Sequence, residues 1–240
     1  MKEIGNTPLG DGGFETGQVL LINKPLHWTS FDAVRKIRNL IRIKKVGHAG
    51  TLDQLATGLL IICTGKFTKR INEYMAQEKE YTGSFTLGAT TPTYDLESKP
   101  ENFKPIEDIT EEKIKIVAKQ FTGPILQVPP AHSAIKVDGK RVYELARQGK
   151  EVKLEPRPVT INAFEITEIK MPVVHFRVVC STGTYIRSLA QDVGEALGCG
   201  AYLSSLCRTR IGDFSVNEAM TIEVFEEKLK RLQDKRIADA

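Results

Sequence analysis

Asp53 is the residue of this chain best placed to do chemistry. It lies in the segment GHAGTLDQLATGLLIICTG, from Gly47 to Gly65, among small and hydroxyl residues. A carboxylate at the edge of a core has few neighbours to solvate it, and perturbed carboxylates of this kind concentrate at working sites. The segment therefore predicts a reactive acid. The alternative is an ordinary turn residue, because Asp in a Gly-rich turn often bonds its own backbone.

The residues around Asp53 predict a tight, exposed loop that leads into a strand. The apolar run Leu59–Cys63 is bounded by Gly58 and Gly65, a length and bounding that favour a buried strand over a helix. Glycines at the start of the segment permit backbone angles that other residues avoid. We therefore expect Asp53 directly before a central strand. The order G-x-x-x-x-G-K-[ST] of a phosphate loop is absent.

A run of cations precedes this loop. Residues 1–70 carry 11 Lys and Arg against 5 Asp and Glu. The apolar residues Val34, Ile37 and Ile41 recur at helical spacing, and Ser30 is the expected N-cap. The opposite face of this helix is basic: Arg35, Lys36, Arg38, Arg42, Lys44 and Lys45. A solvated helix face is one interpretation and contact with a phosphate backbone is the other. We favour RNA contact because this face leads directly into the Asp53 loop.

Composition limits the class of protein. The chain has 240 residues, of which 41% are hydrophobic, enough for a proper core. It contains no apolar run near the roughly 18 residues of a membrane helix, and its polar, Gly-rich start lacks a secretory signal pattern. The four cysteines form no C-x-x-C pair, so we expect reduced thiols, no zinc site and a cytoplasmic location.

The middle of the chain predicts further elements. Thr82–Leu87 reads as a strand, residues 89–108 as a long mobile loop, and Thr110 as the N-cap of a helix. Asp138-Gly139 is suited to a hairpin turn, and Arg141–Gln148 to a short helix. We expect residues 1–18 to form a polar tail, residues 19–240 a catalytic domain, and residues 101–156 an inserted subdomain that clasps a nucleic acid.

The C-terminal part predicts a strand, a helix and a final amphipathic helix. Apolar residues alternate from Val173 to Val178, and Thr184–Leu197 has a helical apolar stripe closed by Gly198. Residues 222–236 form the last predicted helix. Arg187 stands near the start of its helix, where a cation is poorly placed. A buried ion pair would explain it, and we expect Asp53 to be the partner.

The Asp53 segment resembles the catalytic motif of the TruB family of tRNA pseudouridine synthases, G-H-x-G-x-L-D-x-x-A-x-G-x-L. The matching residues are Gly47, His48, Gly50, Leu52, Asp53, Ala56, Gly58 and Leu60. Gln54 stands where the family usually has Pro, a departure expected to loosen the loop. Further blocks follow the family order from about residue 19 to residue 225: Ile22–Pro25 with Thr29-Ser30, Lys79–Tyr81 with Leu87–Asp95, Gln127–Pro130 with Ser133–Lys136, Gly183–Arg187, and Arg208-Thr209.

The resemblance implies a fold, a substrate and a reaction. The fold is α+β, the pseudouridine synthase fold, with a mixed, largely antiparallel sheet flanked by helices. The reaction converts uridine 55 in the TΨC loop of tRNA to pseudouridine, with no cofactor and no metal. The family expectation is a monomer that binds the TΨC stem-loop. Many bacterial members carry a C-terminal domain of the PUA type, which we expect to be absent or vestigial here.

The resemblance also implies roles for individual residues. Asp53 is the catalytic carboxylate, Arg187 holds it ionised and oriented, and Tyr81 stacks on the extruded base. His48 helps to displace the target base, which must be flipped out of a folded RNA. The remaining residues assigned to substrate binding are Tyr185, Leu206 and Lys24, and Lys24 either neutralises phosphate or braces the loop. The resemblance does not decide whether Asp53 attacks C6, attacks C1′ or removes the 2′ proton.

Two other classes of function stay open from the sequence. A non-catalytic RNA-binding or RNA-folding protein would keep all its activity after Asp53→Asn. A nucleotide or sugar hydrolase would normally need two carboxylates, and only Asp53 has a catalytic setting in the sequence. A sister synthase acting on another RNA is a narrower alternative, disfavoured by the blocks beyond the Asp53 motif.

Overall fold

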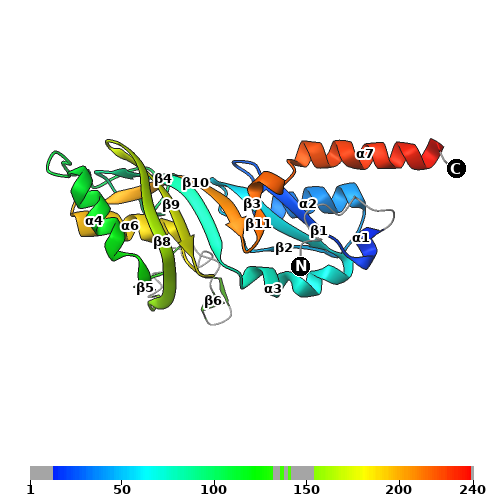
Figure 1. Cartoon of the computed structure of the whole chain (residues 1–240), viewed down its shortest axis with the longest axis horizontal. Helices are drawn as coiled ribbons and strands as arrows, with labels where there is room; N and C mark the ends of the chain where they lie inside the picture. Colours follow the sequence, from blue (N-terminus) through cyan, green and yellow to red (C-terminus); the bar gives the residue numbers. More distant parts are fainter. Residues whose placement is uncertain (1–12, 132–135, 138–139, 142–153, 239–240) are drawn as a thin grey trace. The chain divides into compact units, whose positions relative to one another are not determined.

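A computed structural model describes residues 13–131, 136–137, 140–141 and 154–238 (Figure 1). The chain divides into two compact units, Met1–Tyr81 with Cys207–Ala240, and Thr82–Leu206. The boundaries fall within two strands, β4 (Lys79–Leu87) and β10 (Ala201–Ile211). Both units combine antiparallel strand pairs with helices, which confirms the α+β class.

In the first unit the strand order is β1, β3, β10, with β2 also paired to β3 and β11 to β10. The elements wholly in this unit are α1 (Gly13–Thr16), β1 (Val19–Lys24), α2 (Ser30–Ile41), β2 (Val46–Ala49), β3 (Ala56–Thr64), the 3-10 helix η1 (Gly65–Arg70), α3 (Ile71–Met75), β11 (Phe214–Ser215), the 3-10 helix η2 (Val216–Glu218) and α7 (Ile222–Ala238). The predicted buried strand at Leu59–Cys63 is therefore confirmed as part of β3.

Alternation along β1 and β3 places apolar side chains on both faces of this sheet. One face carries Leu20, Ile22, Leu60 and Ile62 and packs against the apolar stripes of α2 and α7. The other face packs against η1 and α3 through these residues: Val19, Leu21, Leu59, Ile61, Cys63, Phe67, Ile71 and Tyr74. Phe14 of α1, within the predicted polar tail, also joins the α2 and α7 core. The loop before β3 thus leads into a strand that is packed on both faces.

The N-cap of α2 is Thr29, so the prediction of Ser30 was wrong by one residue. The Thr29 hydroxyl accepts a bond from the Asp32 amide, and the Asp32 carboxylate accepts one from the Thr29 amide. Ser30 is the first helical residue and is buried. Its hydroxyl bonds the backbone of Leu52, which joins the start of α2 to the Asp53 loop.

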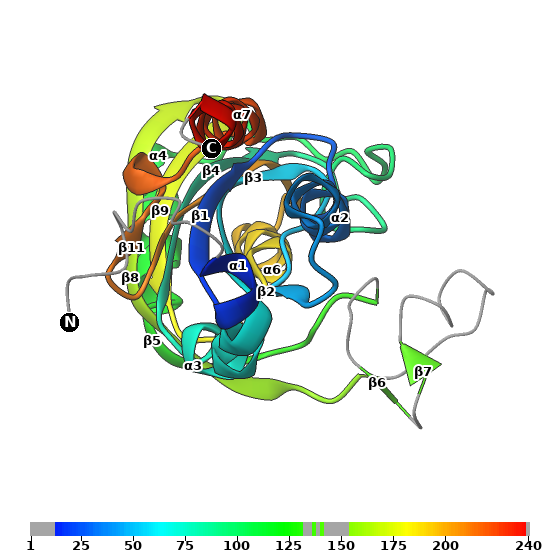
Figure 2. The same ribbon diagram turned by 90° about the vertical axis from the view of Figure 1, so that its right-hand side faces the viewer.

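In the second unit the strand order is β10, β4, β9, β8, β5, and Figure 2 shows β8 and β9 side by side. The elements wholly in this unit are α4 (Glu111–Gln120), β5 (Gly123–Gln127), β6 (Lys136–Val137), β7 (Lys140–Arg141), β8 (Arg157–Lys170), β9 (Val173–Cys180) and α6 (Ile186–Leu197). Helix α4 packs against β8 and α6. Aromatic contacts of Phe176 with Phe85 and Phe164 tie β9 to β4 and β8.

Several predicted elements of the second unit are confirmed. Thr110 caps α4 by accepting a bond from the Lys113 amide. Strands β6 and β7 pair as the predicted hairpin requires, while its turn residues 138–139 lie outside the described residues. Of the helix predicted over Arg141–Gln148, Arg141 instead belongs to β7, and residues 142–148 lie outside the described residues. Residues 89–108 form no helix, as predicted, but they are not a loose loop: Thr91 and Asp95 are buried and Asp95 bridges to Leu203.

Helix α7 confirms the last predicted helix and begins with Ile222 in the core. In the part of the chain that the structure describes, no helix is long and apolar enough to cross a membrane. Cys63, Cys180, Cys199 and Cys207 are all free thiols, as predicted.

Candidate active site

The Asp53 loop connects β2 to β3 and is held at several backbone positions. Gly50 adopts a φ of 84°, in the left-handed region that favours glycine. The Ser30 hydroxyl accepts a bond from the Leu52 amide at 2.9 Å and donates to the Leu52 carbonyl. A turn closes from the Ala56 amide to the Asp53 carbonyl at 3.1 Å. The half-buried Asp53 side chain is therefore carried on a fixed backbone.

Gln54 adds to this support. The His27 amide donates to the Gln54 carbonyl at 2.9 Å, and the Gln54 side-chain amide donates to the His27 carbonyl at 3.1 Å. Proline has no side-chain donor, so the family's usual residue could not make the second bond. This bond is support that proline would lack, and the expectation that Gln54 loosens the loop stays a prediction.

Lys24 lies below the loop with its side chain fully buried. Its ammonium donates to the carbonyls of Pro25 at 3.0 Å and Trp28 at 2.6 Å. Burial, partly offset by the charge of Asp53 and reinforced by that of Arg208, lowers the pKa of Lys24 to about 8. Of the two roles open from the sequence, this burial favours bracing the loop over neutralising a phosphate.

His48, on β2, is held in its neutral form. Burial lowers the pKa of His48, the nearby Arg208 charge lowers it further, and a hydrogen bond with the Gly50 backbone partly offsets both. A neutral imidazole at pH 7 is suited to stacking in the place of a displaced base, and it does not act as a cation toward phosphate. A buried, neutral His48 is compatible with the role implied for it, the displacement of the target base.

Arg208 is the residue of this site whose role the sequence did not reveal. It is fully buried on β10, with 1% of its side chain exposed. Its Nε donates to the Leu59 carbonyl at 2.8 Å and its Nη2 to the Gly50 carbonyl at 3.0 Å. One guanidinium thus joins β3 to the loop that carries Asp53. The available signal was a cation in an apolar strand pattern, because a buried Arg must find partners.

Close packing at Gly58 makes these bonds possible. A Cβ at this position would lie 2.4 Å from the Arg208 carbonyl oxygen and 2.7 Å from its amide nitrogen. Only glycine lets β10 approach β3 this closely. The glycine of the A-x-G-x-L part of the motif is therefore a packing requirement for seating Arg208.

Tyr81 ends the first unit, on β4, with its side chain 8% exposed. Two positions earlier, the buried Lys79 ammonium donates to the carbonyls of Met75 and Gln77 at the end of α3. Glu80, directly before Tyr81, accepts a bond from the Thr209 hydroxyl of β10 at 2.8 Å. The K-x-Y block thus anchors the strand that carries Tyr81.

In the second unit, Arg187 and Tyr185 are fixed by residues of the other motif blocks. Gln127 accepts a bond from the Tyr185 amide at 2.8 Å and donates to the Tyr185 carbonyl at 3.1 Å. The buried Arg187 lies with its Nε 3.8 Å from the Asp95 carboxylate and donates to the Thr93 carbonyl at 3.3 Å. Asp95 is thus one partner of Arg187, and the pairing with Asp53 stays a prediction.

Leu206, also in the second unit, is half-buried on β10. The structure therefore brings together Asp53, His48, Lys24 and Arg208 around one loop of the first unit. It brings together Tyr185, Arg187 and Asp95 in the second. Among the described residues, no group of three or more His, Cys, Asp or Glu could hold a metal ion.

The cations predicted to face RNA lie at α2 and beyond its end. Arg35, Arg42, Lys44 and Lys45 are exposed, as a phosphate-binding surface requires. Arg38 is half-buried and donates to the Val46 carbonyl at 3.4 Å. Of the six cations, these four are therefore accessible to a ligand, while Lys36 and Arg38 are half-buried and Arg38 also supports β2.

Comparisons with known proteins agree with this arrangement. The family described as "TruB family pseudouridylate synthase (N terminal domain)" matches residues 38–186, and "tRNA pseudouridylate synthase B C-terminal domain" matches residues 187–239. The Asp53 loop falls inside the first match. The chain belongs to the TruB family of pseudouridylate synthases.

Close relatives cover nearly the whole chain. A protein of Flavobacterium johnsoniae named tRNA pseudouridine synthase B is 56% identical over 89% of this chain and 96% of its own length. A protein of the same name from Parabacteroides distasonis is 50% identical over 91% and 95%.

Solved structures show the same fold in larger chains. The crystal structure of a Cbf5-Nop10-Gar1 complex contains a chain that matches with a TM-score of 0.70 and 32% identity, over 89% of this chain and 54% of that one. A structure of an H/ACA RNP bound to a substrate RNA containing 2′-deoxyuridine matches with a TM-score of 0.67 and 29% identity, over 89% and 53%.

Replacing Arg208 by Gln is expected to lower kcat by about 10- to 100-fold, because a displaced catalytic group loses much of its rate advantage. RNA affinity should change by less than about threefold. Removing the Arg208 charge should also raise the pKa of His48, which an NMR titration of the histidine signals would follow. Arg210→Gln is the matched control, since Arg210 is half-buried on the same strand and pairs with Glu78. Equal losses in both variants would contradict the role of Arg208.

Replacing Lys24 by Met should change the pH dependence of stability. The folded state lowers the pKa of Lys24 from 10.5 to about 8, so the unfolded chain binds more protons between these values. The wild-type free energy of unfolding therefore gains up to about 1.4 kcal/mol per pH unit in this window, and Lys24→Met lacks that gain. Denaturant unfolding at pH 7, 8.5 and 10 would measure it. A constant difference between the two proteins would show that Lys24 is not perturbed.

Proposed function

We propose that this chain isomerises uridine 55 in the TΨC loop of tRNA to pseudouridine. The observation that carries the proposal is Asp53, held on a fixed loop beside a neutral His48 and a buried Lys24, within a chain of the TruB family. The named relatives support tRNA as the substrate. The enzyme would act as a monomer on the TΨC stem-loop, in the cytoplasm with its tRNA.

The reaction needs no net change in composition. The N1–C1′ glycosidic bond breaks, the base rotates, and a C5–C1′ bond forms. C5 loses its proton and N1 gains one. Asp53 would act first, as nucleophile at C6 or C1′ or as base toward the 2′ proton. Each of these steps requires an ionised carboxylate, and Arg187 is the proposed partner that holds it ionised and oriented.

The remaining residues would handle the base. His48 would take the place of the target uridine as it leaves the RNA loop, a step that costs a few kcal/mol. Tyr81 would stack on the loose uracil, and Tyr185 and Leu206 would line its pocket. Arg208 acts on the backbone of the Asp53 loop and Lys24 on that of the segment from Pro25 to Trp28, and neither need touch the RNA.

A hydrolase would use a second carboxylate beside Asp53. Asp95, a buried carboxylate among the described residues of the second unit, has Arg187 and the Glu97 amide as partners. These partners support isomerisation over hydrolysis.

Tritium release from tRNA labelled at C5 of uridine tests the reaction. Wild type should release tritium from an unmodified transcript, while Asp53→Asn should release none above background. A transcript with cytidine at position 55 should also release none. Asp192→Asn is a control carboxylate on α6, whose own pKa is raised to about 6 by burial and by Glu195. Tight tRNA binding without release by wild type would instead support a binding protein.

Arg187→Ala should reduce turnover far more than tRNA affinity, by about 100-fold against less than about fivefold, because its charge acts on the catalytic carboxylate. Asp95→Asn is the matched variant, since it removes the partner of Arg187 within the second unit. Single-turnover rates and filter binding would separate the two effects. A parallel fall in binding and turnover would contradict the pairing of Arg187 with Asp53.

A further inference from the structure

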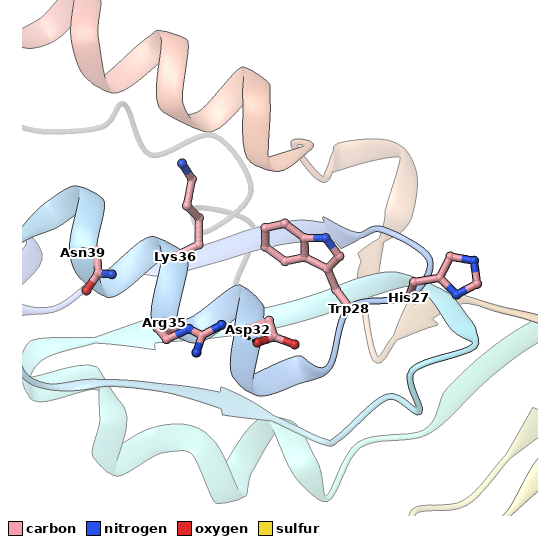
Figure 3. A pocket seen from close by; sticks show the side chains of 6 residues that line it. All are labelled: His27, Trp28, Asp32, Arg35, Lys36 and Asn39. Carbon is pink, nitrogen blue, oxygen red and sulfur yellow. Dashed lines mark hydrogen bonds and ion pairs between the residues drawn. The ribbon is translucent and has the colours of Figure 1, made fainter. Parts of the chain in front are cut away.

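A pocket lies along the outer face of α2, apart from the Asp53 loop (Figure 3). Its volume is about 370 Å³, within the range of sites that hold a small organic group. Six residues line it: His27, Trp28, Asp32, Arg35, Lys36 and Asn39. Arg35 and Lys36 belong to the basic face for which RNA contact is expected, and Asp32 caps the helix, but the side chains of His27, Trp28 and Asn39 have no role in the proposed reaction.

Helical spacing creates this pocket. One face of α2 carries the helical residues of the pocket. Arg35 and Lys36 lie three and four residues after Asp32, and Asn39 lies four and three residues after them. Trp28 precedes the N-cap and closes the end of that face. Part of its indole packs against the core shared by α2 and α7, and part lines the pocket. The core contact fixes the ring as a rigid flat surface.

The charges in the pocket are arranged from one end to the other. Asp32 lies near Trp28, and hydrogen bonds from Thr29 lower the pKa of its carboxyl, so this end is anionic. Arg35 and Lys36 lie further along the helix. Arg35 is 62% exposed beside Asp32, and Lys36 reaches Glu226 of α7 at 2.8 Å. Exposed pairs of this kind are worth little, and each cation keeps N–H donors to spare.

An aromatic surface beside accessible cations is the combination that binds an unpaired nucleotide. We propose that this pocket is a second RNA subsite, in which a nucleobase of the bound tRNA stacks on Trp28 and the adjoining phosphate contacts Arg35 and Lys36. The base is a nucleotide other than the target uridine. The inference rests on the proposed function, because tRNA is the ligand.

The surroundings of the pocket support RNA as its occupant. The exposed cations Arg42, Lys44 and Lys45 follow Arg35 at and beyond the end of α2. A polyanion held in the pocket would therefore meet further positive charge. Asn39, at the far end, offers both a donor and an acceptor to the sugar or phosphate.

Trp28 is the single tryptophan of the chain, so its fluorescence reports this pocket directly. Wild-type protein would be titrated with a tRNA transcript carrying cytidine at position 55, which binds without turnover. Stacking should quench the emission and protect it from acrylamide, with a midpoint equal to the Kd from filter binding. Unchanged emission and unchanged acrylamide quenching at saturating tRNA would overturn the subsite.

Substitutions separate stacking from an indirect effect. Trp28→Ala should weaken tRNA binding by about 5- to 100-fold, and Trp28→Phe, which keeps the core contact, by less. Phe31→Ala is the matched control, because Phe31 is a 59% exposed aromatic residue of α2 outside the pocket lining. Equal losses from Phe31→Ala and Trp28→Ala would overturn the proposal. Arg35→Gln with Lys36→Gln should lower the salt dependence of binding by about one to two phosphate contacts.

Tritium release, measured on the same wild-type preparation, distinguishes the two proposals. Release without quenching would leave the isomerase proposal standing and remove the subsite. Quenching without release would support the RNA subsite and remove the proposed reaction.

Discussion

The guanidinium of Arg208 determines how the loop of Asp53 is held. It donates to Leu59 in β3 and to Gly50 in the loop, two backbone positions that lie on either side of Asp53 in the sequence. Burying a charge is costly unless hydrogen bonds satisfy it. The two hydrogen bonds of the Arg208 guanidinium must therefore form together when Arg208 is buried. Gly58 is needed for the same reason, because a side chain there would clash with the backbone of Arg208, while Gly50 is needed for its φ of 84°. Together with burial, which is the larger cause, the same charge lowers the pKa of His48, and it also lowers that of Lys24.

Helix α2 supports the other side of the same loop. Ser30 bonds Leu52, and the Trp28 carbonyl just before the helix accepts a bond from Lys24. The outer face of α2 carries the proposed RNA pocket, while its inner face packs with α7 on the sheet. One short segment, from His27 to Asp32, therefore contributes to the loop support, to the helix cap and to the pocket. A change in this segment would alter all three together.

The motif blocks of the second unit also have structural explanations. Thr91 and Thr93, in the block from Leu87 to Asp95, donate to the Asp95 carbonyl and hold the segment in which Asp95 meets Arg187. Gln127 fixes both backbone groups of Tyr185, directly before the helix that carries Arg187. Some residues of a family motif thus position the backbone, and others are left to face a substrate.

The sequence by itself determined the elements that depend on local periodicity and the catalytic candidate that depends on a motif. The β3 run, the apolar stripes of α2 and α6, and the Thr110 cap all follow from residues a few positions apart, and each is confirmed. Tertiary structure decided the partners that lie far apart in the chain. Arg208 finds Leu59 across 149 positions and Arg187 finds Thr93 across 94. Thr29 became the cap because Ser30 was drawn to Leu52, 22 residues away. Periodicity shows which face is buried, but hydrogen-bond partners depend on which strands and loops pack together.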